Sequence, residues 1–216
     1  MLEVRDTLKH GASLQPKDES RPSTVAGVLL CGGKSVRMGS DKALLELDGK
    51  RLFEYPLALL DELCGKVVLA CGPKERYADL GRPLALDAEA DAGPLAGLVA
   101  GLGATDAEWV LALGCDMPSV TIEHAAALLD EAARRSLDIC VYESARGPEP
   151  LCAVYRSTCL SPARAALAAG QRRLVSFWKE PLLIGRLPAP EAALANLNTL
   201  EDLARERARR NAEEAP

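Results

Sequence analysis

Short apolar segments alternate with segments of helical periodicity along most of this chain, and this alternation limits the folds open to it. The apolar segments are continuous runs of small and branched side chains, typical of strands buried on both faces of a parallel sheet. They span residues 25–30, 66–71, 84–87, 109–114, 138–142, 151–155 and 182–185. The alternation predicts an α/β fold: a single Rossmann-like domain of three layers, in which helices cover both faces of a mostly parallel sheet.

The first helices are marked by apolar periodicity and by proline. Apolar residues at near-helical spacing predict a helix through residues 52–63. Pro94 follows Gly93 at the start of a second helix, where the missing N–H of a proline has little cost. Ser119 or Thr121 is expected to cap a third helix.

Two further helices are predicted near the C-terminus. Ser161 is expected to cap one of them, with Pro162 at its first position and Gly170 at its end. Thr199 and Asp202 have the spacing of a capping box and predict a terminal helix that frays over residues 209–211.

The length of 216 residues suits one sizeable domain. Residues 1–24 are polar and charged, so we expect a flexible N-terminal extension that is dispensable for folding. The predicted domain spans residues 25–204, and residues 205–216 are expected to form a fraying C-terminal helix and tail.

The charge and cysteine pattern exclude several classes of protein. A net charge of -5 argues against a general nucleic-acid binder, which would present a basic surface. The seven cysteines are scattered without a C-x-x-C pair, so neither a zinc site nor a disulfide framework is expected. No apolar run is long enough to span a membrane, and the N-terminus lacks the layout of a secretion signal. These features predict a cytoplasmic protein.

A glycine-rich loop follows the first predicted strand, over residues 30–42. The loop opens with Leu30, Cys31, Gly32 and Gly33, and the glycines let a ligand approach backbone N–H groups. Its cations can neutralise a triphosphate; they are Lys34, Arg37 and Lys42. The loop fits neither the dinucleotide-binding nor the Walker pattern, so a different nucleotide loop is predicted. The plainer alternative is a glycine-rich surface turn with solvated cations.

Two carboxylates, Asp87 and Asp116, come at the ends of two predicted strands that we expect to be adjacent. The carboxyl ends of parallel strands share one edge of the sheet, so both should lie beside the glycine-rich loop. Mg²⁺ prefers carboxylate and phosphate oxygens, which makes Asp116, before the turn at Pro118, a candidate magnesium ligand. Alternatively, Asp87 and Asp116 are only turn or capping residues.

Two other segments could contribute to a site. Residues 93–97 place a helix N-terminus on the same edge, where free N–H groups could meet a base or ribose oxygen; the alternative is a simple capped helix. Arg172 and Arg173, followed by Phe177 and Trp178, offer two phosphate-binding groups beside aromatic surface. Alone, this pair would be read as a solvated charged turn.

These motifs together resemble the molybdenum cofactor guanylyltransferases, a family of nucleotidyltransferases with a fold like that of the nucleotide-diphospho-sugar transferases. The resemblance covers about residues 25–204. It is carried by Leu30-Cys31-Gly32-Gly33 with Arg37-Met38-Gly39 and Asp41-Lys42, Gly93-Pro94-Leu95-Ala96-Gly97, Cys115-Asp116-Met117-Pro118, Gly170-Gln171-Arg172-Arg173 and Asn196-Leu197-Asn198-Thr199.

The resemblance implies a role for each matched position. Residues 30–33 would wrap the nucleotide, Arg37 and Lys42 would bind its phosphates, Asp87 would hold the nucleoside and Asp116 would ligate Mg²⁺. The residues expected to face the pterin are Arg172, Arg173, Asn196 and Asn198. Two positions depart from the family: Cys31 replaces the usual alanine, and Gly72 stands where relatives can carry a nucleotide-binding asparagine.

The implied activity is transfer of GMP from GTP to molybdenum-loaded molybdopterin, with release of pyrophosphate. Candidate partners are a molybdenum-insertion protein and recipient molybdoenzymes or their chaperones; no nucleic acid or membrane is expected. The nucleophile would be a phosphate oxygen, so no general base is required. The alternatives are a CTP-using cofactor cytidylyltransferase, another small-phosphate nucleotidyltransferase, or, from a different class, a non-catalytic nucleotide- or cofactor-binding partner.

Overall fold

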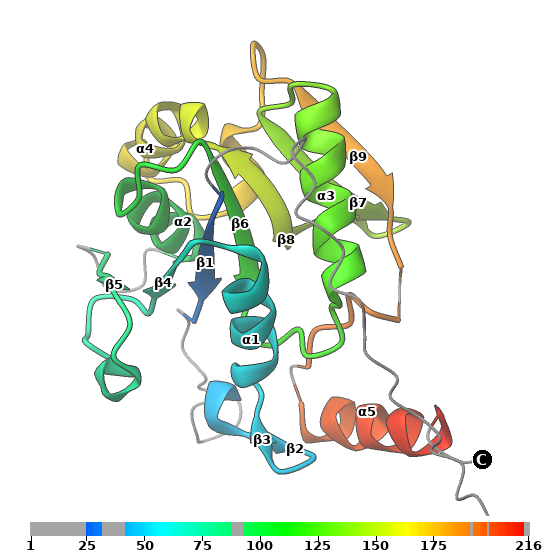
Figure 1. Cartoon of the computed structure of the whole chain (residues 1–216). Coiled ribbons are helices and arrows are strands. Elements are labelled where there is room, and N and C mark those ends of the chain that lie inside the picture. The colour runs from blue at the N-terminus through cyan, green and yellow to red at the C-terminus, as the bar shows by residue number, and fades with distance from the viewer. Residues whose placement is uncertain (1–24, 32–41, 88–92, 191, 198, 214–216) are drawn as a thin grey trace, which may run out of the picture.

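The computed structural model describes residues 25–31, 42–87, 93–190, 192–197 and 199–213. A central sheet lies between helices on its two faces, and a last helix lies beyond one edge of this sandwich (Figure 1). The predicted three-layer α/β fold with a mostly parallel sheet is confirmed. No helix in the described part of the chain is long and apolar enough to cross a membrane.

The main sheet has seven strands in the order β5-β4-β1-β6-β8-β7-β9. Their bounds are β1 Val25–Leu30, β4 Lys66–Ala70, β5 Leu84–Ala85, β6 Trp109–Gly114, β7 Ile139–Ser144, β8 Gly147–Arg156 and β9 Ile184–Pro188. The pairs β1/β4, β1/β6, β4/β5 and β7/β9 are parallel. Strand β8 runs antiparallel to both of its neighbours, β6 and β7.

Two helices cover each face of the sheet. On one face lie α1 (Glu54–Leu63) and α3 (Ile122–Arg134), whose apolar residues pack with those of β1, β4 and β6 in one core cluster. On the other face lie α2 (Gly93–Gly103) and α4 (Leu160–Ala168), which share a second cluster with the opposite side chains of the same strands. Because side chains alternate across a strand, these continuous apolar runs supply both cores.

The capping of α3 decides between the two predicted capping residues. The Thr121 backbone N–H donates to His124 Nδ1 at 3.1 Å, and the two side chains form a capping box. Thr121 is therefore the N-cap, whereas Ser119 lies upstream in the preceding turn. His124 is occupied in this structural role.

The start of α4 differs from the prediction. A short 3-10 helix, Ser157–Cys159, leads directly into α4, whose N-cap is Cys159 and whose first residue is Leu160. Ser161 and Pro162 therefore lie within the first turn. Proline is tolerated there because the first-turn N–H groups have no partner within the helix.

The C-terminal helix α5 spans Leu200–Glu213, and its predicted capping box is present. Thr199 N–H donates to Asp202 Oδ2 at 2.9 Å, and Asp202 N–H donates to Thr199 Oγ1 at 3.0 Å. The helix continues through residues 209–211, where the sequence predicts fraying, to Glu213. Hydrogen bonds to the Glu206 carboxylate stabilise the last turns of this helix, and the sequence did not predict them.

The segment between β1 and α1 contains a two-stranded hairpin that was not predicted. It is formed by β2 (Glu46–Leu47) and β3 (Lys50–Arg51). Positive φ angles at Asp48 and Gly49, of 52° and 76°, turn the chain between them. Two-residue strands are too short to show alternation in sequence. Three more 3-10 helices are Lys42–Leu44, Ala78–Leu80 and Leu174–Phe177.

Candidate active site

The carboxyl ends of the parallel strands form one rim of the sheet, where most candidate residues gather. The pairing of β1 with its neighbours continues past the strand ends, because Cys31 N–H donates to Ala70 O at 2.9 Å and Cys115 N–H donates to Leu30 O at 3.2 Å. Leu30 and Cys31, the predicted start of the nucleotide loop, are therefore buried at the centre of this rim. Gly32, Gly33 and Arg37 lie outside the described residues.

Three cysteines lie side by side beneath the rim, at the ends of β1, β4 and β6. They are Cys31, Cys71 and Cys115, and all three are buried. Hydrogen bonds with the thiols of Cys115 and Cys71, together with burial, raise the pKa of Cys31 well above its ordinary value. Only a thiolate is a strong nucleophile, so Cys31 acts as a small packing residue.

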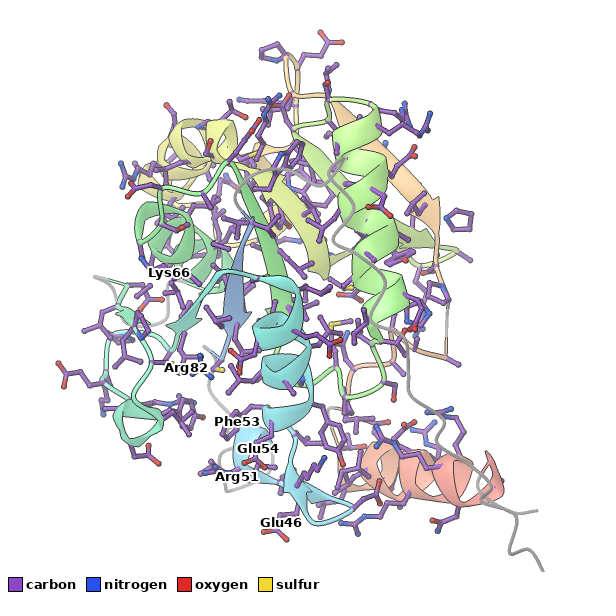
Figure 2. The ribbon with its side chains drawn as sticks, viewed as in Figure 1. Glu46, Arg51, Phe53, Glu54, Lys66 and Arg82 are labelled. Carbon is purple, nitrogen blue, oxygen red and sulfur yellow. The ribbon has the colours of Figure 1, made fainter. Side chains whose placement is uncertain are left out.

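Lys42, the other predicted phosphate ligand, begins the 3-10 helix that leads into the hairpin. This part of the chain is tied to the start of α1, because Phe53 N–H donates to Ala43 O at 3.3 Å. Figure 2 shows Arg51 and Glu54 at the first turn of α1, where Arg51 Nη2 lies 2.9 Å from Glu54 Oε1. Hydrogen bonds from Arg51 lower the pKa of Glu54, so this carboxylate stays charged at the helix N-terminus.

Asp116 lies two residues after β6 and is only 5% exposed. Its carboxylate occupies space left by a glycine: a Cβ on Gly114 would lie 2.8 Å from Asp116 Oδ1 and 3.4 Å from Leu151 Cβ. The backbone is held as well, because Leu197 N–H donates to Asp116 O at 3.0 Å. Gly114 therefore makes room for the side chain that the sequence singled out.

Glu149 is a second acidic residue near Asp116, and the sequence analysis missed it. Strand β8 pairs antiparallel with β6, with Leu113 opposite Cys152, so the start of β8 lies alongside the chain that follows β6. Burial, and then the charge of Asp116, raise the pKa of Glu149. Asn196 Nδ2 donates to Glu149 Oε2 at 3.3 Å. Antiparallel pairing at this point had no signal in the sequence.

Asp87 lies on the same rim but farther from Asp116 than predicted. Strands β5 and β6 are not adjacent, because β4 and β1 lie between them. Burial raises the pKa of Asp87, and its buried Oδ1 makes no hydrogen bond within the described part of the chain. Gly72, with a φ of +84°, accepts the Asp87 N–H at 3.4 Å through its carbonyl. An acceptor left without a donor at a rim suits a bound ligand.

The start of α2 packs closely against the arginine segment. Gly93 has a φ of +75°, and a Cβ there would lie 2.9 Å from Arg172 O. The Leu95 N–H donates to the same carbonyl at 3.3 Å, so this N-terminal donor is not free for a ligand. The contact brings Arg172 and Arg173 to the rim beside α2, and both are exposed.

The expected aromatic surface beside the arginines is wrong. Phe177 is only 1% exposed and belongs to the core beneath α2 and α4. Tyr155 lies between Phe177 and Trp178, with ring centroids at 6.3 Å and 6.2 Å. The two aromatics therefore anchor the arginine segment instead of forming a stacking surface. Of the two predicted asparagines, Asn196 lies beside Glu149 and Asn198 lies outside the described residues.

The acidic side chains near Asp116 are candidate ligands for Mg²⁺. The described residues contain no group of three or more histidine, cysteine or acidic side chains that could hold a metal ion. Mg²⁺ bound with a nucleotide needs only one or two protein carboxylates, since phosphates and water complete its shell. The Asp116 carboxylate, in the space above Gly114 and near Glu149, fits that requirement.

A family model and two relatives of this chain indicate the same family. Residues 27–183 match the family model described as a MobA-like NTP transferase domain. The chain is 34% identical over 188 residues to a probable molybdenum cofactor guanylyltransferase of Nostoc sp., covering 84% of this chain and 90% of the relative. It is also 34% identical over 193 residues to the molybdenum cofactor guanylyltransferase of Burkholderia vietnamiensis, covering 84% and 94% of the two chains.

Solved structures support the fold. The molybdopterin-guanine dinucleotide biosynthesis protein A of Archaeoglobus fulgidus superimposes with a TM-score of 0.73 at 24% identity, covering 87% of this chain and 99% of that one. The 2-C-methyl-D-erythritol 4-phosphate cytidylyltransferase of Thermus thermophilus superimposes with a TM-score of 0.65 at 17% identity, covering 85% and 98%. At these identities the two structures show the fold alone.

Proposed function

The chain belongs to the MobA-like NTP transferase family, and from this premise we propose that it transfers GMP from GTP to molybdenum-loaded molybdopterin. The products would be the molybdopterin guanine dinucleotide cofactor and pyrophosphate. The observation that carries the proposal is the rim itself: Asp116, Asp87 and the start of the nucleotide loop at Cys31 all lie at the carboxyl ends of the sheet.

The nucleotide would bind across the centre of this rim. Residues 30–33 would wrap it, with Leu30 and Cys31 held between β4 and β6. Arg37 and Lys42 would neutralise its phosphates. The buried Oδ1 of Asp87 would accept a hydrogen bond from the nucleoside, which agrees with its lack of a partner in the described part of the chain.

The acceptor would be bound by residues from two segments of the chain. Arg172 and Arg173 reach the rim through the contact with α2, and Asn196 reaches it beside Glu149. With Asn198, these residues would bind the pterin and its phosphate.

Asp116 would hold a Mg²⁺ ion, which when bound would neutralise charge on the nucleotide phosphates. In the reaction, the terminal phosphate oxygen of molybdopterin forms a bond with the α-phosphorus of GTP, and the bond from that phosphorus to the bridging oxygen breaks. Pyrophosphate leaves with the electron pair. Alignment by the rim residues and neutralisation by Arg37 and Lys42 would supply the catalysis.

The attacking phosphate oxygen is already ionised near neutral pH, so this chain would need no general base. The position of His124 agrees with that, because its ring caps α3. We also propose that the protein works in the cytoplasm, with a molybdenum-insertion protein and recipient molybdoenzymes or their chaperones as partners. All seven cysteines are free and six of them are buried, which suits a reducing compartment.

The test is pyrophosphate release by the purified protein with Mg²⁺, molybdenum-loaded molybdopterin, and GTP, CTP, ATP or UTP in parallel. Release with GTP alone is expected. Release with CTP alone would identify a cytidylyltransferase. Gly72 is the reason to test CTP, because relatives can carry a nucleotide-binding asparagine at that position. GTP binding without release, with or without Mg²⁺, would instead indicate a different acceptor or a non-catalytic binding protein.

A further inference from the structure

Strand β8 brings a carboxylate to the rim from an unexpected direction. It is the strand of the main sheet that runs against its neighbours, so its first residues, and not its last, lie at the carboxyl ends of the parallel strands. Glu149 is the third residue of β8 (Gly147–Arg156) and is half-buried beside the chain that follows β6. The reaction proposed above assigns it no role.

The Glu149 side chain contacts a residue that is expected to face the acceptor. Asn196 Nδ2 donates to Glu149 Oε2 at 3.3 Å. The next residue, Leu197, donates its N–H to Asp116 O at 3.0 Å. Three segments distant in sequence, at residues 116, 149 and 196–197, therefore meet at this junction.

A carboxylate constrains the orientation of an amide that contacts it. An ionised carboxylate only accepts hydrogen bonds, so Asn196 must turn its NH₂ group toward Glu149. The amide oxygen then faces away. In the structure Asn196 Oδ1 is buried and makes no hydrogen bond within the described part of the chain. A buried acceptor without a donor is unfavourable, and such groups are retained where a ligand can satisfy them.

We infer that Glu149 is a positioning residue, which orients the Asn196 amide so that its oxygen accepts a hydrogen bond from an N–H donor of the acceptor substrate. The ligand class is a nitrogen heterocycle with amino or ring N–H groups, as in a pterin. The inference rests on the proposed function for the identity of that substrate. Glu149 would act through Asn196 and would not itself touch the reacting atoms.

Four variants test this: Glu149→Ala, Glu149→Gln, Asn196→Ala and the double variant with both alanines. The readouts are KM for molybdopterin, kcat, GTP affinity and the Mg²⁺ concentration for half-maximal rate. Glu149→Ala should raise KM for molybdopterin about tenfold, as one lost hydrogen bond allows, with the other three quantities within about twofold. Glu149→Gln keeps an acceptor oxygen and should restore most of the affinity.

The double variant should be no worse than Asn196→Ala alone, because a residue that acts through Asn196 has nothing left to orient. Glu108→Ala is the matched control: Glu108 precedes β6 at the opposite end of the sheet and pairs with Arg156. It should leave KM for molybdopterin unchanged. Thermal unfolding of each variant identifies any that fail to fold.

Three results would overturn the inference. Additive losses in the double variant would mean that Glu149 and Asn196 act independently. A Glu149→Gln variant as impaired as Glu149→Ala, with a raised Mg²⁺ requirement, would mean that the charge itself acts on the metal. Quenching of pterin fluorescence measures molybdopterin binding without nucleotide. If the wild type binds molybdopterin but shows no turnover, the proposed function is refuted, and the comparison of binding among the variants still tests the inference. If the wild type binds no molybdopterin, both the proposed function and the inference are overturned.

Discussion

At the residue scale, Asp116 and Gly114 act as a pair. The acid comes two residues after the glycine, and its carboxylate occupies the space that a β-carbon on Gly114 would enter. The chain is also held by the Leu197 N–H at the Asp116 carbonyl. The position of the carboxylate is therefore set by its own turn and by a distant segment.

Replacing Asp116 with alanine should abolish turnover while the protein stays folded. In the proposed function Asp116 holds the metal against the phosphates, so its removal should lower kcat by roughly a hundredfold or more. The measurement is pyrophosphate release, with circular dichroism as the check on folding. A folded variant that still releases pyrophosphate at a near-normal rate would refute the assignment of Asp116 as the metal ligand.

Replacing Gly114 with alanine should also lower kcat, because the new methyl group would displace the Asp116 carboxylate. The contact of 2.8 Å is too short for a Cβ, so the acid or the adjacent strand must shift. Overpacking of this kind costs about 1–3 kcal/mol of stability. Gly65→Ala is the control, since no atom lies within 4 Å of its Cβ position, and it should leave kcat unchanged. Equal kcat values for the two variants would contradict this account.

At this scale the sequence identified Asp116, Asp87 and the arginine pair, because each follows an apolar strand or a helix-ending glycine. It missed Glu149, which has no distinctive neighbours in sequence. It also misjudged Phe177, which it placed on a surface although the side chain is in the core. Adjacent polar residues in a sequence do not reveal which neighbours a tertiary fold buries.

At the scale of elements, α5 links the Asp116 turn to the hairpin (Figure 1). Glu206 is 6% exposed, and Oε1 accepts hydrogen bonds from Ser119 Oγ at 2.5 Å and Arg210 Nε at 2.9 Å. Arg210 Nη2 donates to Pro118 O at 3.0 Å. On the hairpin side, Arg207 Nη2 donates to Glu46 O at 2.6 Å. The helix therefore holds residues 118 and 119, directly after the acid.

Replacing Glu206 with alanine should destabilise the protein by about 2 kcal/mol, because it removes a buried carboxylate that accepts hydrogen bonds from Ser119 and two partly exposed arginines. It should also lower kcat, since the turn after Asp116 loses one of its supports. Urea unfolding and pyrophosphate release measure the two effects. The control is Arg205→Ala, whose ion pair with Asp202 is exposed and should contribute less than about 0.5 kcal/mol. A Glu206 variant as stable as this control would show that α5 does not secure the turn.

Part of this arrangement was readable from sequence. Glu206, Arg209 and Arg210 have the i, i+3 and i+4 spacing of helical ion pairs, which favours a continuing helix over the fraying that was predicted. The contacts with Ser119 and Pro118 bridge about 90 residues, and no local pattern indicates them. The helix caps at Thr121 and Thr199 could be predicted because a cap involves only its next few residues.

At the scale of the whole molecule, acid stability should depend on Glu206. Although burial opposes its ionisation, hydrogen bonds from Arg209, Ser119 and Arg210 lower its pKa to about 2. A carboxyl with a lowered pKa stabilises the folded state above its unfolded pKa, and that stabilisation is lost as the pH falls through the folded value. Its contribution at neutral pH is below roughly 3 kcal/mol, given ~1.4 kcal/mol for each tenfold change in proton affinity, because solvent screens the partly exposed arginines that lower the pKa.

The expected outcome is a free energy of unfolding that falls between about pH 4.5 and pH 2 in the wild type and falls less in Glu206→Ala. Chemical denaturation at a series of pH values measures both. Carboxyls in exposed ion pairs, such as Glu131, should contribute little to the slope because solvent screens them. Identical pH dependence in the two proteins would show that Glu206 is not linked to unfolding.

Local patterns in the sequence were enough to predict the strands of the main sheet, most of the helices, the fold class and the acids at the strand ends, because periodicity, capping and turn chemistry act over a few residues. Only the tertiary structure decided that β4 and β1 separate Asp87 from Asp116, that β8 runs antiparallel and carries Glu149 to the rim, and that α5 docks on the Asp116 turn. Strand order and docking depend on which apolar faces are buried together across the whole chain, and many pairings satisfy the same local patterns.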